Sequence, residues 1–366
     1  MESVDIGPVR LQANRPVLVW AAPGHEWFPV IDRFPGGEVV AMWSTMPDVE
    51  MFAYQGLISH STDGGHSWQD PYAVGNWFSV RHPMPDGALR GVPYYVYPRP
   101  RGQAHTFATH LVTVRPGGRH QIAPYAVSVK AFPRPLSLSP TGAAVFVFDG
   151  NILDVGGRWI TTMYGRFEGD ALYSLVLMSS SDKGLSWTYE TTIACGDDTP
   201  GAPEGPCEAT LEELDGGQLV CVYRIGSGVQ WNYRASRSAD EGRSWTKPEV
   251  LDGPRSVEPC LRRLNSGLLA LSGGRPGLFL WLCTDGACRQ WHTFDVLKHH
   301  NTTCGHPEWL LAEDGSQTTA YTEIVEIEPD RLLYIYDRIP MGWRAVPADS
   351  PDRNMIFVVE IHVERK

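Results

Sequence analysis

Two glutamates and a tyrosine stand at matching places in a pattern that recurs along the chain. The pattern is an apolar segment, a turn rich in Gly or Asp and a second apolar segment, and copies begin at Phe28, Glu208, Glu258 and Tyr321. If the copies are equivalent inner strands of repeated units, their first residues converge and bring two carboxyl groups and a phenol together. A phenol with a pKa near ~10 is a weak nucleophile until a neighbouring carboxylate takes its proton. The pattern therefore predicts Tyr321 as a nucleophile with Glu208 as its base.

A second repeat indicates the elements that must position these side chains. The motif Ser-x-Asp-x-Gly-x-x-Trp occurs three times and a looser copy follows, at residues 61–68, 180–187, 238–245 and 284–291. The Asp carboxylate can accept backbone N–H groups of a tight turn, and the Gly permits the positive φ that such a turn needs. The Trp packs back between neighbouring sheets. Each copy therefore marks the same hairpin in one repeated unit.

Together the two repeats predict an all-β fold, a six-bladed β-propeller of four-stranded antiparallel blades that fills residues 1–366 as one domain. A weaker copy of the strand pattern begins at Ile152, and a blade without the turn motif is expected near residues 75–140. The alternating segment 355–364 is expected to complete the last blade beside residues 15–20, which closes the ring and removes exposed edges. Long loops in residues 91–140 are expected to shape a binding mouth.

The turn motif resembles the Asp-box, or BNR repeat, of the sialidase (neuraminidase) superfamily. There the motif is structural and also occurs in non-catalytic proteins, so it supports the fold more than the function. The segment from Glu208 to Arg224 resembles the superfamily's base glutamate and following arginine, and Tyr321 opens the last blade, where the nucleophile stands. The resemblance implies an exo-acting glycoside hydrolase that releases a terminal sugar, which could be acidic, from a glycan with retention of configuration.

The resemblance is incomplete at the substrate-binding arginines. The superfamily holds the substrate carboxylate with three arginines, because a guanidinium matches a carboxylate as a fork. Arg224 and Arg275 resemble the second and third members. The first is missing, because residues 26–29 read Glu-Trp-Phe-Pro where the superfamily has Tyr-Arg-Ile-Pro. Glu258 is expected to line the same pocket and contact the substrate.

Three assignments stay open within this interpretation. Arg166 or Arg338 could replace the missing arginine, with Arg166 preferred as a substrate-binding residue. Alternatively the substrate lacks the carboxylate and Trp27 stacks on a sugar ring. The acid/base is expected on the loop before the first turn motif, where Asp48 fits and Glu50 is a rival.

Two other functions remain open on the same scaffold: a polysaccharide lyase of acidic glycans, and a carbohydrate-binding propeller without catalysis. A lyase would use a Tyr or a His as its base. The candidate histidines are His25, His82, His105, His110 and His120. In a purely structural interpretation, Glu208 is a rim carboxylate and Tyr321 is a packed core phenol.

Composition excludes several other classes. The net charge of −11 argues against a nucleic-acid partner, whose phosphates require a basic face. No apolar run is long enough to span a membrane, and the start of the chain lacks the features of a signal peptide, which favours a cytoplasmic protein or a secreted one whose leader has been removed. The seven cysteines are expected as reduced, buried thiols, and no motif predicts a metal or another cofactor.

Overall fold

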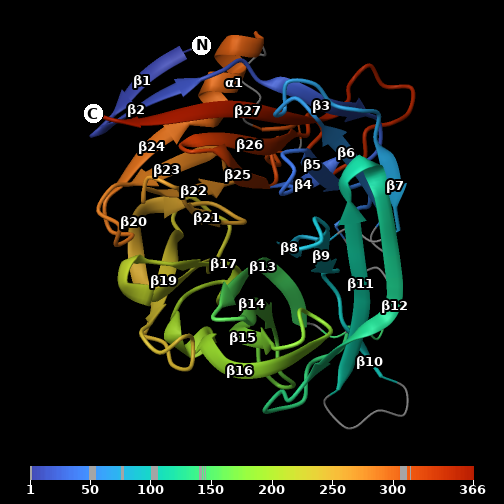
Figure 1. The fold of residues 1–366 in the computed structure, drawn as a ribbon, viewed down its shortest axis with the longest axis vertical. Coiled ribbons are helices and arrows are strands. Elements are labelled where there is room, and N and C mark those ends of the chain that lie inside the picture. The colour runs from blue at the N-terminus through green and yellow to red at the C-terminus, as the bar shows by residue number, and fades with distance from the viewer. Residues whose placement is uncertain are drawn as a thin grey trace.

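The strands of the chain form five sheets that surround a common centre (Figure 1). The computed structural model describes residues 2–48, 55–75, 78–99, 106–139, 142, 144, 146–305, 311–313 and 315–366. Almost all regular structure in these ranges is β-strand, so the all-β expectation is confirmed. The helical elements are α1 (Val296–Cys304) and the short 3₁₀ turns η1 (Pro116–Gly118), η2 (Gly196–Asp198) and η3 (Asp215–Gly217). In the described part of the chain, no helix has the length and apolar character needed to cross a membrane.

Three sheets have the four antiparallel strands expected of a blade, in chain order. The first contains β4 (Trp27–Arg33), β5 (Val39–Ser44), β6 (Gly56–Ser61) and β7 (Tyr72–Val74). The second contains β17 (Cys207–Glu213), β18 (Leu219–Arg224), β19 (Asn232–Ser238) and β20 (Glu249–Arg255). The third contains β21 (Cys260–Arg263), β22 (Leu269–Gly273), β23 (Phe279–Cys283) and β24 (Trp291–Asp295).

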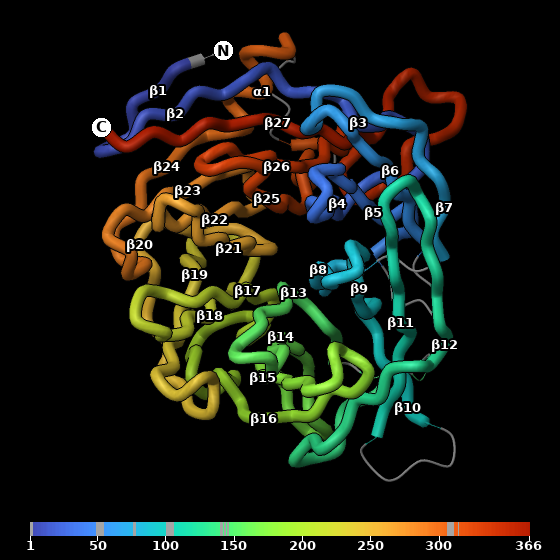
Figure 2. Tube along the Cα trace, viewed as in Figure 1, coloured from blue at the N-terminus to red at the C-terminus, as the bar shows by residue number. Residues whose placement is uncertain are grey.

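A six-stranded sheet joins the two ends of the chain. Its strands are β1 (Glu2–Ile6), β2 (Val9–Ala13), β3 (Val17–Ala22), β25 (Thr322–Glu328), β26 (Arg331–Arg338) and β27 (Asn354–Arg365). The long strand β27 pairs antiparallel with β3 along its first half and with β2 along its second half, and Figure 2 shows these blue and red segments side by side. The N-terminal strands therefore cover the edge that β27 would otherwise expose.

A nine-stranded sheet departs from the four-stranded expectation. Its strands are β8 (Val80–Pro83), β9 (Leu89–Val92), β10 (Tyr97–Pro98), β11 (Phe107–Arg115), β12 (Arg119–Lys130), β13 (Phe146–Val155), β14 (Arg158–Gly165), β15 (Ser174–Ser180) and β16 (Ser186–Ala194). It consists of two groups, β8–β12 and β13–β16, which are joined where β12 pairs parallel with β16 over three residue pairs. No local sequence signal marks so short a parallel contact, so the junction was not predictable.

The turn motifs join the third and fourth strands of their units, as the sequence pattern predicts. In the copy between β6 and β7, Asp63 accepts hydrogen bonds from Ser67 N at 2.9 Å and Ser67 Oγ at 2.6 Å. Asp182 and Asp240 make the same pair of bonds in the turns β15–β16 and β19–β20. The looser copy lies between β23 and β24, where Asp285 accepts from Ala287 N at 2.8 Å.

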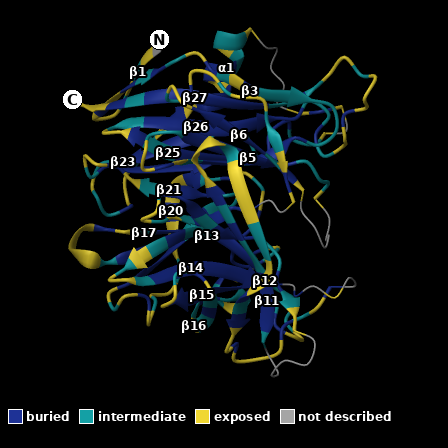
Figure 3. Ribbon diagram, turned by 45° about the vertical axis from the view of Figure 1, so that its right-hand side comes forward, coloured by how far each residue is buried: buried dark blue, intermediate teal, exposed yellow. Residues whose placement is uncertain are grey.

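The hydrophobic core is divided among the gaps between neighbouring groups of strands. Among the described residues, six buried clusters lie at such gaps. One of them separates β8–β12 from β13–β16, although these two groups share a sheet. Figure 3 shows buried residues along the strands of the interior and exposed residues along the β11–β12 hairpin. Each group of strands is therefore held by apolar packing on both of its flanks.

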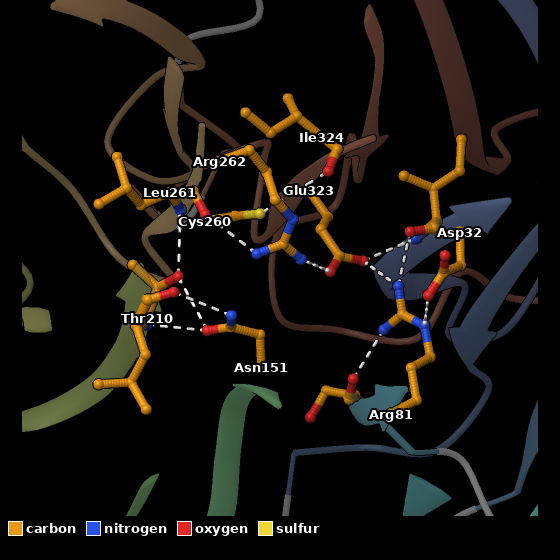
Figure 4. Close-up of polar contacts among 12 residues, drawn as sticks. Asp32, Arg81, Asn151, Thr210, Cys260, Leu261, Arg262, Glu323 and Ile324 are labelled. Atoms are coloured by element: carbon orange, nitrogen blue, oxygen red, sulfur yellow. Dashed lines mark hydrogen bonds and ion pairs between the residues drawn. The ribbon is translucent and has the colours of Figure 1, made fainter. Parts of the chain in front are cut away.

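A belt of polar contacts ties the innermost strands together around the centre, and its charged half is centred on Arg81 in β8 (Figure 4). The buried Arg81 guanidinium pairs with Asp32 of β4 at 3.1 Å and with Glu323 of β25 at 2.7 Å. Glu323 also pairs with Arg262 of β21 at 3.2 Å and accepts Ile31 N–H at 2.7 Å. Four strands far apart in sequence are therefore joined through one carboxylate.

The neutral half of the belt runs through Asn151 in β13 (Figure 4). Asn151 donates to Leu211 O at 2.9 Å and accepts from Leu211 N at 2.8 Å, a two-bond clasp on β17. Thr210 of β17 donates to Asn151 Oδ1 at 3.2 Å and accepts Leu261 N–H of β21 at 3.2 Å. Belt residues also line a cavity of about 20 Å³, large enough for one water, together with Glu258 and Tyr321; they are Asn151, Thr210, Arg262 and Glu323.

Candidate active site

Three of the four residues at the matching places of the strand pattern, all but Tyr321, share an unusual backbone conformation. Phe28, Glu208 and Glu258 have φ values of 56°, 36° and 47°, and Gly150 in β13 has a φ of 90°. The pairing register shifts at Phe28 between β4 and β5 and at Glu208 between β17 and β18. Such bulges re-aim side chains, and left-handed strain in non-glycine residues tends to occur at functional sites. The inner strands therefore begin with side chains turned toward a shared point.

Tyr321 and Glu208 meet at this point. Tyr321 Oη donates a hydrogen bond to Glu208 Oε1 at 2.6 Å, although 113 residues separate them in the chain. Glu208 is buried, and its other oxygen Oε2 forms an ion pair with Arg224 Nε at 2.6 Å and accepts Glu258 N–H at 2.9 Å. The carboxylate is thus fixed on one side, and its second oxygen is available to take the phenol proton.

The backbone at Tyr321 is anchored by hydrogen bonds, and the raised pKa of the side chain keeps the phenol neutral. The buried Asp337 in β26 accepts the backbone N–H groups of Tyr321 at 3.3 Å, Ala320 at 2.5 Å and Phe28 at 3.1 Å. Burial raises the pKa of Asp337 to about 6. Burial and then the charge of Glu208 raise the pKa of Tyr321 well above its ordinary value, against the opposing charge of Arg275. A nucleophilic Tyr321 therefore requires a base.

The two arginines that resemble substrate-binding residues differ in their surroundings. Arg224 is shared between two carboxylates, Glu208 and Glu204, the latter at 3.0 Å from Nη1, so its charge is balanced within the protein. Arg275 instead lies over the rings of Trp343 at 4.6 Å and Tyr321 at 5.7 Å. Its buried Nη1 has no hydrogen-bond partner among the residues that the structure describes. Arg275 is thus the arginine best placed to donate hydrogen bonds to an oxygen of a ligand.

The two residues named as replacements for the missing arginine differ in their distance from the site: Arg166 borders it, whereas Arg338 is buried against Thr318. Arg166, which follows β14, lies over the ring of Tyr173 at 5.6 Å, and Tyr173 is within electrostatic range of Glu204 and Arg224. Arg166 therefore borders the site from the side of Arg224. Arg338 is fully buried and donates to Thr318 at 3.3 Å and to Asn301 of α1 at 3.5 Å.

The expectation that Trp27 offers a ring face to a sugar does not fit the structure. It is only 1% exposed, it is stacked between His25 and Phe28, and its indole N–H donates to Met46 O at 2.7 Å. The positive φ of Phe28 turns that neighbouring ring inward, where it contacts Tyr321 with a centroid distance of 4.5 Å. Trp27 is thus packing behind the site rather than a binding platform.

Asp48 lies at the mouth of the site. The residue is exposed, and its carboxyl group interacts electrostatically with Arg275, Glu208 and Arg224. Desolvation of the carboxyl group raises its pKa, so the group can keep a proton to donate. The rival Glu50 lies outside the described residues.

The candidate histidines do not gather at the Tyr321–Glu208 pair. His82 packs on Trp159, His110 on Tyr125 and His120 on Tyr72, with centroid distances between 4.6 and 5.5 Å. His25 packs against Trp27, and His105 lies outside the described residues. Within the described part of the chain, no group of three or more His, Cys, Asp or Glu residues could hold a metal ion.

Several residues at the site were not predicted from sequence. They are Tyr94, Asp149, Tyr164, Glu204 and Trp343. Tyr94 Oη is hydrogen-bonded to Tyr164 Oη, and the charges of Glu208 and Asp149 act on Tyr164. Stepping back from the turn glycines Gly156 and Gly157 by the interval that separates Glu208 from its own turn leads to Phe148, the residue next to Asp149. No repeat or motif marks the others.

A family model described as a BNR repeat-like domain matches residues 94–320, more than half of the chain. No curated protein matches the chain in sequence. Among solved structures, a protein of unknown function from Dyadobacter fermentans is 18% identical with a TM-score of 0.71, and the match covers 97% of this chain and 99% of that one. An alpha-L-arabinanase from Penicillium chrysogenum, complexed with arabinobiose, is 14% identical with a TM-score of 0.61, covering 95% and 98%. The endosialidase of phage phi92 is 11% identical with a TM-score of 0.57, covering 97% and 70%. At these identities the likeness concerns the fold alone.

Proposed function

The chain belongs to the BNR repeat-like family, and we propose that it is an exo-acting glycoside hydrolase that releases a terminal sugar from a glycan with retention of configuration. The observation that carries the proposal is the 2.6 Å hydrogen bond from Tyr321 Oη to Glu208 Oε1. A nucleophile in contact with its base, with the base oriented by a third group, is the arrangement that covalent catalysis needs. Arg224 is that third group here.

We also propose that the strand groups form six blades of a sialidase-like propeller. The cluster between β8–β12 and β13–β16 divides the nine-stranded sheet in two, and the six clusters then correspond to six gaps. This division places the starts of β4, β17 and β21 and the residue before β25 around one axis. It accounts for the meeting of Phe28, Glu208, Glu258 and Tyr321.

In the first step, Tyr321 Oη attacks the anomeric carbon while its proton passes to Glu208 Oε1. Asp48 donates a proton to the departing glycosidic oxygen, so the leaving group departs as an alcohol. In the second step, Asp48 takes a proton from a water that attacks the anomeric carbon from the opposite face. The bond to Tyr321 breaks, and the phenol recovers its proton from Glu208.

The arrangement around the dyad bears on the sugar that is cleaved. Arg224 is balanced by two glutamates, so an acidic sugar would depend on Arg275, with Arg166 at the border of the site. A neutral sugar would instead pack one face against the partly exposed ring of Trp343 while Arg275 binds a hydroxyl group. The arabinanase and endosialidase neighbours are one example of each class. We therefore propose a terminal sugar of either class as substrate.

The test is hydrolysis of a panel of aryl glycosides, including sialic acid, uronic acid and arabinofuranose glycosides. The protein is compared with Tyr321→Phe and with Tyr189→Phe, a matched control in β16 whose hydroxyl contacts Thr192. Release of one aglycone, abolished by Tyr321→Phe and retained by Tyr189→Phe, supports the proposal and identifies the sugar. Equal release by all three proteins contradicts it. A product that absorbs in the ultraviolet, formed from an acidic polysaccharide, would instead indicate a lyase.

A further inference from the structure

A second pair of carboxyl groups lies directly beside Glu208. Asp149 belongs to the inner strand β13 and is 2% exposed, and Glu258 lies two residues before the first residue of the inner strand β21. The two carboxyl groups lie close enough for a hydrogen bond between them if one carries a proton. Because an ionised carboxylate can only accept hydrogen bonds, such a contact requires that one of the two carries a proton.

Two buried oxygen atoms support this interpretation. Asp149 Oδ2 and Glu258 Oε2 are both buried, and neither accepts a hydrogen bond from an N–H or O–H donor of the described residues. The backbone N–H of Gly150 donates to the Asp149 carboxyl group and so orients it. Two unpartnered carboxylate oxygens in a buried place are costly unless a proton lies between them.

The pair is mechanically connected to the proposed catalytic dyad. The backbone N–H of Glu258 donates to Glu208 Oε2 at 2.9 Å, and Glu258 holds a left-handed φ of 47° to do so. Any displacement of Glu258 therefore moves a donor that fixes the base of Tyr321. Glu258 also lines the small cavity that it shares with belt residues.

The surroundings disfavour two negative charges at this place. Burial and then the charge of Glu208 raise the pKa of Asp149, and burial followed by the charges of Asp149 and Glu208 raises the pKa of Glu258. The charged or titratable groups that face the pair from the neighbouring strands are Glu208, Arg224, Glu323, Tyr164, Tyr233, Tyr321 and Cys207. The cation among them, Arg224, is already paired with Glu208 and Glu204, and Arg262, which lines the small cavity together with Glu258, is paired with Glu323.

We propose that Asp149 and Glu258 share one proton between Oδ2 and Oε2, and that this proton positions Glu208 for its action on Tyr321. The pair then carries one negative charge instead of two. When the proton is lost at high pH, two carboxylates in contact repel each other, and the Glu258 N–H is drawn away from Glu208. The catalytic consequence rests on the proposed function, whereas the shared proton does not.

The substitution Glu258→Gln reproduces the singly protonated pair permanently. The amide N–H₂ donates to the Asp149 carboxylate, so shape, hydrogen bond and charge are kept while the titrating proton is removed. Asp149→Asn does the same from the other side, which provides a second variant in case one of them folds poorly. Glu213→Gln, at an exposed position at the end of β17, is the matched control.

The first measurement is infrared difference spectroscopy across a pH titration of the purified protein, without any substrate. We expect a carbonyl band of a protonated carboxylic acid that disappears at alkaline pH, is present in Glu213→Gln and is missing from Glu258→Gln and Asp149→Asn. A band that persists in both amide variants, or the lack of such a band in the unaltered protein, would overturn the proposal. Because no substrate is used, this result is independent of the proposed function.

The second measurement is the pH profile of turnover, with each protein scaled to its own maximum. On the alkaline side, the unaltered protein should lose activity about tenfold per pH unit, at the pH where the carbonyl band disappears. The two amide variants should lose less than about twofold over the same interval. Identical alkaline limbs in all four proteins would overturn the positioning role and leave the proposed function standing. A protein with no hydrolytic activity would instead contradict the proposed function while the infrared result still decided the shared proton.

Discussion

Glu208→Gln is the substitution for which the site geometry gives the clearest expectation. The amide keeps the shape of the side chain but cannot take the proton of Tyr321, with which Glu208 Oε1 is in contact at 2.6 Å. Loss of a general base costs about 10²–10⁴-fold in rate. We therefore expect kcat to fall by about this factor on the glycoside that the protein cleaves, with a much smaller change in KM.

The same substitution should affect stability modestly. Arg224 loses its 2.6 Å ion pair with Glu208 but keeps Glu204 at 3.0 Å, so its charge is not left without a partner. A lost hydrogen bond to a charged group costs about 1.5–3 kcal/mol, which should appear as a lower midpoint of urea unfolding with an unchanged slope.

Glu204→Gln is the matched control, because it removes the other carboxylate from Arg224 without touching Tyr321. The expected loss in kcat is smaller than for Glu208→Gln by at least about tenfold. Comparable losses in the two variants, or a Glu208→Gln protein that keeps more than about a tenth of the original kcat, would refute the assignment of Glu208 as base.

Three further substitutions test other parts of the structure. Arg81→Met leaves Asp32 without its buried cation, so we expect a loss of about 3–5 kcal/mol in the free energy of unfolding, measured with urea. Burial raises the pKa of Glu26 from 4.5 to about 7, so its contribution to stability is full below pH 4.5 and is lost as the pH rises through 7. Relative to Glu26→Gln, the protein should therefore lose up to about 3 kcal/mol between pH 4.5 and 8; a constant difference would contradict this cause. Asp48→Asn should slow hydrolysis of alkyl glycosides by about 10²–10⁴-fold and activated aryl glycosides much less, and equal effects on both would exclude Asp48 as the acid.

The sequence was most informative where a repeat fixed the register. The turn motifs located the hairpin between the third and fourth strands of the units that carry them, since the side-chain hydrogen bonds of Asp63, Asp182 and Asp240 depend on neighbours within five residues. Aligning the strand pattern then placed Glu208 and Tyr321 at equivalent positions, which the structure brings into contact. The local turns and the equivalence of the repeated strand starts could therefore be predicted from the sequence.

The remaining features depend on contacts that no local pattern encodes. Asp149 lies just before the weaker copy of the strand pattern, which begins at Ile152, and a bulge between Asp149 and Leu153 shifts the register there, so the pattern does not mark it. Trp27 was expected to face a sugar, but the positive φ of Phe28 turns Phe28 rather than Trp27 toward Tyr321. Tyr94 reaches Tyr164 from outside the repeats, in the stretch before the β11–β12 hairpin. These positions are decided by packing between distant segments.

The central claim is that Tyr321 becomes covalently bonded to the sugar during turnover. The most direct test uses the 2-fluoro derivative of the glycoside that the protein cleaves, which slows both steps, followed by proteolysis and mass spectrometry of the quenched protein. The account predicts that the added sugar mass lies on the peptide that contains Tyr321 and is missing in Tyr321→Phe. Sugar attached to a peptide that contains Glu208, Glu258 or Asp149, or rapid hydrolysis by Tyr321→Phe, would contradict it.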